Sequence, residues 1–192
     1  ALVGCRKAPR VVKIGLVAPF EGQNRVVGYD VIYSARLAVR EINKSGGIGG
    51  YHLALTALDD GGDPDQAAEV ADSLVIDPDV VAVVGHWMTA TTAIAKPIYQ
   101  EAGLPFVAGG ERPFVRFQPQ GLPANFLSDY AAVTPFDETA GPYAGPAYDA
   151  FYLLIRAMEK IIAEERPITR QTLASALQDL DYEGITGEVY LP

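Results

Sequence analysis

The sequence predicts an α/β fold built on a doubly wound, mostly parallel sheet with helices on both faces. The hydrophobic period switches repeatedly between two and 3.6 over residues 11–108, which is typical of strands that alternate with helices. A continuous Val-rich run at 80–85 has the pattern of a parallel strand buried on both faces. The chain has 192 residues, of which 49% are hydrophobic, and is long enough for one sizeable domain.

Periodicity predicts strands over 11–17, 53–57, 80–85 and 105–108, alternating with helices over 29–45, 63–76 and 89–101. The first helix shows an apolar stripe at spacings of three, four and three, formed by Ile32, Ala35, Val39 and Ile42. Asp63 is a good N-cap for the second helix because Pro64 follows it at the first helical position. Each helix thus has a local reason to form and a place to begin or end.

The regular alternation ends after Gly110. Residues 111–128 contain three prolines and show no sustained period. Beyond them the pattern predicts a strand over 129–136, a long helix over 147–165, a shorter helix over 169–180 and a terminal strand over 186–191.

Charge is distributed unevenly along the chain. Arg6, Lys7, Arg10 and Lys13 precede the first acidic residue, and the rest of the chain holds eleven basic against 24 acidic residues. Nucleic acid is excluded as a partner for so acidic a body, because phosphate binding needs a basic face. No run reaches the roughly 18 apolar residues that a membrane-spanning helix requires.

The only cysteine lies near the start, in Leu2-Val3-Gly4-Cys5. This stretch resembles the lipobox at which bacterial lipoproteins are cleaved and acylated. We expect residues 1–10 to comprise a signal-peptide remnant, the lipobox and a basic tether, with Cys5 carrying the lipid anchor. The alternative is a chance four-residue match in an unstructured tail.

Several stretches resemble familiar sites but lack their context. The glycines of 46–50 follow a helix and open a strand, whereas a dinucleotide fingerprint does the reverse, so they predict a turn. A cluster of four acids comprises Asp59, Asp60, Asp63 and Asp65. Their spacing is not that of an EF-hand, and the sequence lacks the other acids and the lysine that a receiver domain needs. The cluster therefore predicts a solvated turn.

Catalytic and metal-binding groups are not evident in the sequence. His52 and His86 have no partner at metal-ligand spacing, and there is no nucleophile elbow. We therefore expect no enzymatic activity, no metal and no cofactor.

Two stretches at predicted strand ends are candidate binding segments. In "GHWMTATT", the hydroxyls of Thr89, Thr91 and Thr92 lie at a helix N-terminus that could hold a carboxylate, with Trp87 as an exposed apolar face beside it. The alternative is plain N-capping by Thr89, with Trp87 as packing.

In "VAGGERPF", two glycines permit a sharp turn after the fourth strand, and Glu111 and Arg112 project from the same edge. The alternative is a solvated ion pair in a connecting loop.

The ordered stretches together resemble the type I periplasmic binding proteins, the leucine/isoleucine/valine-type solute receptors of ABC transporters. The most specific block is "GYDVIYSARLAVREINKSGGIGGYHLALTALDDGGDPDQAAEVADSLV", and "VVKIGLVAPFEG", "VVAVVGHWMTATTAIAKPIYQEAGLPFVA" and "GPYAGPAYDAFYLLIRAME" fit around it. The resemblance spans residues 11–191 and implies a two-lobed clamshell that binds amino acids, amides or similar solutes.

The chain departs from this family between Phe117 and Asp129. The family would place its whole second lobe there, on the order of 100 residues or more, where this chain has about a dozen. We therefore expect one lobe over 11–192, with the connection 112–128 in place of the second.

The resemblance implies that the groups of this lobe that bind the head of the ligand follow the third and fourth strands. These positions are Trp87, Met88 and Thr89, and Gly110, Glu111 and Arg112, and the first loop adds Phe20 and Arg25. The replacement of a small hydroxyl-bearing loop by Gly-Glu-Arg departs from generic amino-acid recognition.

Two functions follow as hypotheses. The first is an extracytoplasmic, membrane-tethered protein that binds small amino acid-like or amide-like solutes and works with an ABC permease. A second copy of the chain or another protein would complete its half-site. The second is a non-transport interaction module, such as an accessory lipoprotein subunit of an envelope complex.

Overall fold

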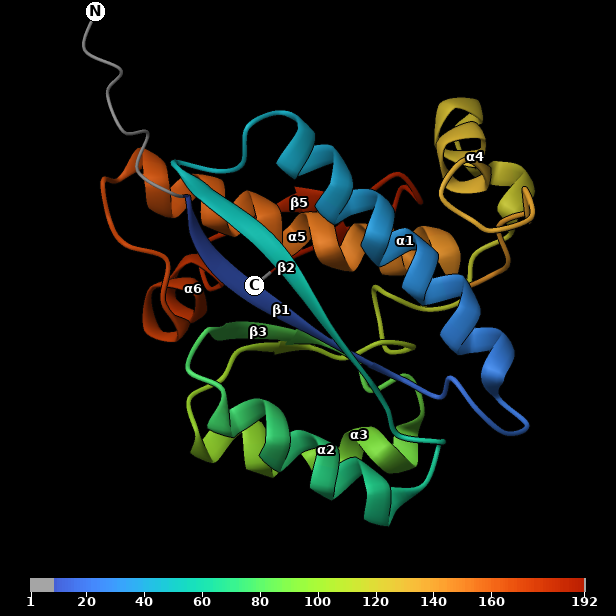
Figure 1. Cartoon of the computed structure of the whole chain (residues 1–192), viewed down its shortest axis with the longest axis horizontal. Helices are drawn as coiled ribbons and strands as arrows, with labels where there is room; N and C mark the ends of the chain where they lie inside the picture. The colour runs from blue at the N-terminus through green and yellow to red at the C-terminus, as the bar shows by residue number, and fades with distance from the viewer. Residues whose placement is uncertain (1–8, 192) are drawn as a thin grey trace, which may run out of the picture.

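The computed structural model of the chain describes residues 9–191 and confirms the predicted α/β architecture (Figure 1). The predicted lipobox and its Cys5 anchor lie outside the described residues. Within that described range, no helix combines the length and apolar character needed to cross a bilayer.

Four strands and three helices alternate through the first part of the chain. They are β1 (Arg10–Ala18), α1 (Arg25–Lys44), β2 (Tyr51–Asp59), α2 (Pro64–Ile76), β3 (Val80–Val84), α3 (Thr89–Glu101) and β4 (Phe106–Val107). The second part is mainly helical, with a 3-10 turn (Pro119–Gly121), α4 (Ala124–Ala131), α5 (Ala144–Ala163), α6 (Arg170–Leu177), β5 (Tyr182–Glu183) and β6 (Val189–Tyr190).

The main sheet is parallel, with strand order β2-β1-β3-β4. β1 pairs along its whole length with β2, from Arg10 opposite Tyr51 to Ala18 opposite Asp59. On its other side β1 pairs with β3, ending with Leu16 opposite Val84. The chain winds outward in one direction through β2 and in the other through β3 and β4, so the strand order reverses between β1 and β3.

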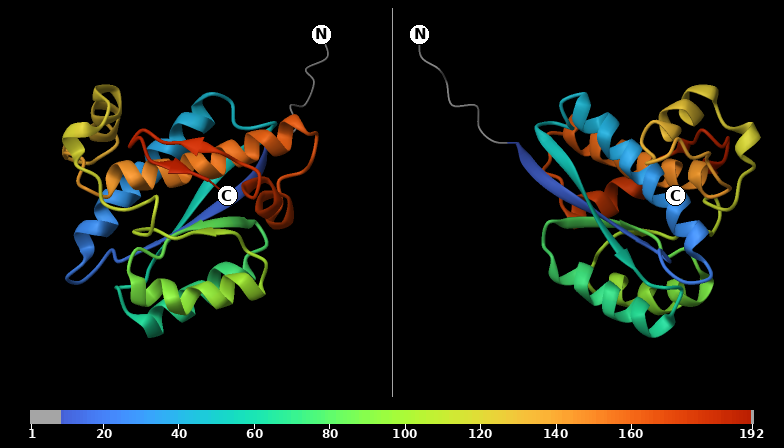
Figure 2. Two further views of the ribbon diagram at one scale, coloured as in Figure 1. Left: turned by 180° about the vertical axis from the view of Figure 1, so that it is seen from behind. Right: turned by 45° about the vertical axis from the view of Figure 1, so that its right-hand side comes forward.

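Helices cover the sheet in two layers (Figures 1 and 2). α2 and α3 lie on one face, and α1, α5 and α6 lie on the other. β1 shows how the period of two serves both layers, because Ile14 and Leu16 belong to the larger core under α1 and α5, whereas Val17 faces α2. Gly15 also faces α2, where the absent side chain lets Leu74 approach within contact distance.

The strand predicted over 129–136 is wrong. α4 occupies Ala124–Ala131 and is followed by turns. Phe126 and Tyr130, four residues apart, bury one helical face against the larger core, and the Tyr33 ring meets Tyr130 edge-on with centroids 6.2 Å apart. The aromatic spacing across the predicted boundary was the helical signal that the apolar run obscured.

The predicted terminal strand is shorter than expected and does not join the main sheet. β6 pairs antiparallel with β5, which the sequence did not predict, in a two-stranded ribbon of its own. Asp149 of α5, which is 2% exposed, anchors this segment by accepting the backbone N–H groups of Ile185 (2.8 Å) and Thr186 (3.1 Å) and the Thr186 hydroxyl (2.6 Å). Burial raises the pKa of Asp149, and these hydrogen bonds oppose the shift.

We predict that Thr186→Val raises the pKa of Asp149 further and lowers the free energy of unfolding at neutral pH by about 1.5 kcal/mol, since a buried charge loses a hydrogen bond. A carboxyl group whose pKa is raised in the folded state binds protons more readily there than in the unfolded state. The resulting loss of folding free energy is complete above the pKa of the folded state and absent below the pKa of the unfolded state. The difference in the free energy of unfolding between Thr186→Val and the wild-type protein, measured by urea titration, should therefore become smaller as the pH falls toward about 4. Thr139→Val, at an exposed position, is the matched control; a gap that is independent of pH would contradict this account.

Candidate functional site

The carboxyl ends of β1 and β3 meet where the strand order reverses, which is where open α/β sheets hold their ligands. The loops after β1, β2 and β3 come together there. A Cβ added at Gly62, after β2, would lie 3.9 Å from Met88 Cγ and 3.3 Å from Asn24 Nδ2. We call this surface, formed by residues 19–25, 59–63, 86–89 and 108–114, the carboxyl edge.

The loop after β1 is tied down at Phe20. Its backbone N–H donates to Asp59 Oδ1 over 2.8 Å, and its ring is half-buried against the larger core. Gly28 in the first turns of α1 allows this approach, because an added Cβ would lie 2.7 Å from the Phe20 ring. Arg25, the first residue of α1, is exposed, and no hydrogen bond or ion pair of its side chain ties it to the other predicted site residues.

The prediction that Trp87 presents an exposed apolar face is wrong. Trp87 is only 4% exposed, because its ring lies against Gly109 of the next loop, where any Cβ would overlap the indole. The Tyr143 ring meets the indole edge-on, with centroids 6.1 Å apart. The indole Nε1 is buried and has no hydrogen-bond partner within the described part of the chain.

α3 begins at Thr89 with Met88 in the N-cap position, and no side chain caps its first turn. The alternative that Thr89 is the N-cap is therefore wrong. Thr89 is exposed, whereas Thr91 and Thr92 turn inward and donate their hydroxyls to the carbonyl oxygens of Met88 (3.1 Å) and His86 (2.9 Å). Thr89 alone of the three offers its hydroxyl to the solvent side of the carboxyl edge, next to backbone N–H groups at the positive end of the helix.

The loop after β4 folds back on itself, because the Gly110 N–H donates to the Phe114 carbonyl over 2.8 Å. Gly110 has φ +78, and a Cβ there would lie 2.9 Å from the Trp87 carbonyl oxygen. The structure thus brings Gly110 against Trp87. Glu111 and Arg112 are both exposed, and the structure records no ion pair between them.

Sequence reasoning missed the contribution of the closing segment. Tyr143, just before α5, packs on Trp87, and the Arg116 guanidinium lies 5.5 Å from the Tyr143 ring centroid. Buried Asp30 of α1 holds this segment by accepting the Tyr143 N–H over 3.1 Å. Burial raises the pKa of Asp30, and this hydrogen bond opposes the shift. The signal available in the sequence was the Gly/Pro-rich stretch "GPYAGP" that leads into a long helix.

The solvated turn predicted for the acids after β2 is correct for Asp63 and wrong for Asp60. Asp63 caps α2 by accepting the Asp65 N–H over 2.8 Å. Asp60 is fully buried and lies 2.7 Å from His86 Nδ1. No group of three or more potential metal ligands occurs among residues 9–191.

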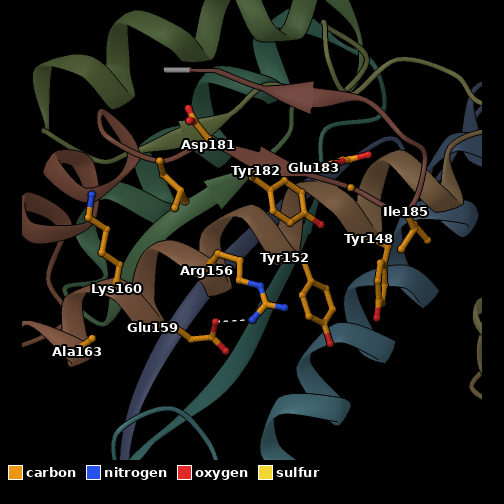
Figure 3. A pocket seen from close by; sticks show the side chains of 12 residues that line it. Tyr148, Tyr152, Arg156, Glu159, Lys160, Ala163, Asp181, Tyr182, Glu183 and Ile185 are labelled. Atoms are coloured by element: carbon orange, nitrogen blue, oxygen red, sulfur yellow. Dashed lines mark hydrogen bonds and ion pairs between the residues drawn. The ribbon is translucent and has the colours of Figure 1, made fainter.

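A separate hollow of about 750 Å³ lies between α5 and residues 180–185 (Figure 3). Figure 3 shows Tyr148, Tyr152 and Arg156 of α5 below Tyr182. The hydroxyls of Tyr148 and Tyr152 both donate to Glu41, over 2.8 and 2.7 Å, so the polar groups of the two tyrosines are already satisfied. Of the predicted site residues that the structure describes, none lines this hollow.

We predict that Gly109→Ala displaces the Trp87 indole, because the added methyl group overlaps the ring. The expected loss of stability is about 1–3 kcal/mol, as for an overpacked core. Trp87 is the only tryptophan, so its fluorescence and near-UV circular dichroism report the displacement directly. Gly121→Ala, whose methyl would approach only the Phe117 ring at 3.0 Å, serves as the control, and an unchanged Trp87 spectrum in Gly109→Ala would refute the packing.

Comparisons with known proteins agree with the resemblance seen in the sequence. A family model described as "Periplasmic binding protein" matches residues 11–124. An amino acid binding protein of Pseudomonas aeruginosa is 30% identical over 184 residues, covering 91% of this chain and 47% of that protein. A leucine-, isoleucine-, valine-, threonine-, and alanine-binding protein of the same organism is 37% identical over 97 residues, covering 50% of this chain and 26% of its own length. The chain therefore spans less than half the length of these relatives.

Solved structures show the same fold. A branched-chain amino acid transporter substrate binding protein of Streptococcus pneumoniae, in complex with isoleucine, superposes with a TM-score of 0.77 at 16% identity, covering 93% of this chain and 91% of that one. A leucine binding protein of Thermotoga maritima gives a TM-score of 0.72 at 12% identity, covering 92% and 90% of the two chains. The matched family is one of solute-binding proteins and not of enzymes. This chain belongs to the periplasmic binding protein family.

Proposed function

We propose that this chain is a binding protein for amino acids or amide-like small solutes, of the type that serves an ABC transporter. The names of its relatives, which describe amino acid binding, support this function over catalysis. Membership of the periplasmic binding protein family implies an extracytoplasmic location. An ABC permease is the partner that this function requires.

The observation that carries the proposal is the uncapped first turn of α3 at the point where the strand order reverses. Its backbone N–H groups and the exposed Thr89 hydroxyl are donors suited to a carboxylate. Arg112 and Arg25 add positive charge along the same edge, and Glu111 is an acceptor for an ammonium group. This combination fits the two charges of an amino acid.

We further propose that the chain acts as one lobe, with residues 112–128 in place of a second. A single lobe leaves one side of the solute in water, and binding proteins gain affinity by enclosing their ligands. A second copy of the chain, or another envelope protein, would supply the missing wall. The interaction-module hypothesis shares this exposed edge and differs in requiring no solute.

We predict that the protein binds at least one of a calorimetric panel of amino acids, amides and small carboxylates, more tightly at protein concentrations that favour a dimer. Thr89→Val should weaken binding about tenfold or more, because a hydrogen bond to a charged group is lost. Thr56→Val, in the middle of β2, should leave the affinity unchanged. Absence of binding by the wild-type protein at every concentration would overturn the solute-binding function and favour the interaction module.

We predict that Cys5→Ser releases the protein from membranes when it is produced in cells that process lipoproteins. An acyl chain contributes about 0.8 kcal/mol for each buried CH₂ group, and the variant cannot carry one. The measurement is the partition of the protein between the membrane and soluble fractions. Ser45→Ala, which changes a side-chain hydroxyl at a site away from residue 5, is the control and should remain in the membrane fraction. Equal membrane retention of Cys5→Ser and wild type would refute the anchor.

A further inference from the structure

Two residues of the carboxyl edge, Asp60 and His86, form a buried hydrogen-bonded cluster with Tyr99. Asp60 follows β2, His86 follows β3, and Tyr99 belongs to α3; none of the three is exposed. His86 Nδ1 lies 2.7 Å from Asp60 Oδ2, and His86 Nε2 lies 3.0 Å from the Tyr99 hydroxyl. Three segments of chain therefore meet at one imidazole.

One arrangement of hydrogens satisfies every group in this cluster. Asp60 accepts the Gly62 N–H through Oδ1 over 3.0 Å, and as an ionised carboxylate it can only accept, so His86 Nδ1 carries the proton that faces it. Nε2 of the neutral ring then presents a lone pair, and the Tyr99 hydroxyl donates to it. Burial, aided by the Asp60 charge, raises the pKa of Tyr99, which keeps this hydroxyl protonated and able to donate.

Protonation of Nε2 would break this arrangement. The ring would then offer two donors, and the Tyr99 hydroxyl would have to turn its hydrogen away from Nε2. The turned hydrogen would then need another acceptor in a pocket where the Tyr99 ring packs on Phe106, with centroids 5.6 Å apart. A buried donor without an acceptor is costly, so the hydrogen-bond geometry favours donation from the Tyr99 hydroxyl to Nε2.

The cluster is joined directly to the backbone of the carboxyl edge. The His86 carbonyl accepts the Thr92 hydroxyl over 2.9 Å, so residue 86 is held through both its ring and its backbone. The preceding residue, Gly85, lies so close to the Val17 backbone that no Cβ would fit. The next three residues are Trp87, Met88 and Thr89, which form the candidate site.

We propose that His86 is a positioning residue for solute binding, held as the neutral Nδ1–H tautomer between Asp60 and Tyr99. The ring joins the end of β2 to α3 and thereby sets the course of residues 87–89. The expected effect on solute affinity rests on the proposed function. The tautomer of His86 and the position of Trp87 can be measured without a solute.

The first test compares Tyr99→Phe with Tyr130→Phe. Tyr99→Phe keeps the ring and removes only the donor to His86. Tyr130→Phe removes an equally buried hydroxyl, which donates to the Asp30 carbonyl over 3.4 Å on the other side of the sheet. The readouts are Trp87 emission from the folded protein, the thermal midpoint, and the calorimetric affinity for L-leucine.

We expect Tyr99→Phe to shift Trp87 emission and to weaken L-leucine binding about fivefold, the equivalent of one ordinary hydrogen bond. Tyr130→Phe should lower the thermal midpoint without either change. If both variants lower the midpoint and neither moves Trp87 emission, the cluster is merely structural and the inference is overturned. If wild-type protein binds no panel solute, the proposed function fails, and Trp87 emission still decides whether the cluster positions the loop.

The second test identifies the tautomer. The chain has two histidines, so His52→Gln leaves His86 as the only ¹⁵N-histidine signal. At neutral pH we expect a protonated Nδ1 and an unprotonated Nε2, and a shift of the Nε2 resonance in Tyr99→Phe. A protonated Nε2 in the wild-type ring would refute the arrangement.

Discussion

The pairing of β1 with both of its neighbours is the constraint on which the rest of the structure depends. β1 lies between β2 and β3, so the strand order reverses beside it and three loops reach one edge of the sheet. Side chains of β1 pack into both helical layers, which requires small or branched residues at each position and no polar interruption after Lys13. The candidate site is a consequence of this topology before any particular side chain is considered.

Buried carboxylates hold the loops of this fold in place. Asp60, Asp30 and Asp149 are each less than a tenth exposed. Asp30 and Asp149 accept backbone N–H groups from segments far along the chain. Asp60 accepts a backbone N–H group in its own tight turn. The desolvation of such a charge is offset only when several donors converge on it. Glycine is required at these points of convergence, as at Gly141 beside Asp30 and Gly184 beside Asp149, because any Cβ would overlap the carboxylate. The late segments of the chain are thereby held against α1 and α5.

Predictability from sequence followed the range of the interactions. The strands and helices up to β4 could be predicted because period, caps and glycines are local signals. The burial of Trp87 and the Asp60–His86 contact could not, since each depends on a partner far along the chain, Tyr143 or a residue 26 positions away. The helix α4 had a local signal in the spacing of Phe126 and Tyr130, which the apolar run over 129–136 obscured. Trp87, Thr89 and Gly110 lie at one edge because the order of the strands determines where β3 and β4 end, and their role in binding stays a prediction.

The carboxyl edge carries charges of both signs. Like the whole chain, whose formal net charge is −9, it has more acids than bases, but the first turn of α3 contains no acid, and Arg25 and Arg112 are exposed on the same edge. In open solvent such charges attract weakly, about 1 kcal/mol for a pair 4 Å apart, and several times more once water is excluded. The Trp87 indole N–H at this edge is buried and has no acceptor among the described residues. If a second surface closes over the edge as proposed, the exclusion of water would strengthen the attraction between a bound charge and the donors and charges already present there.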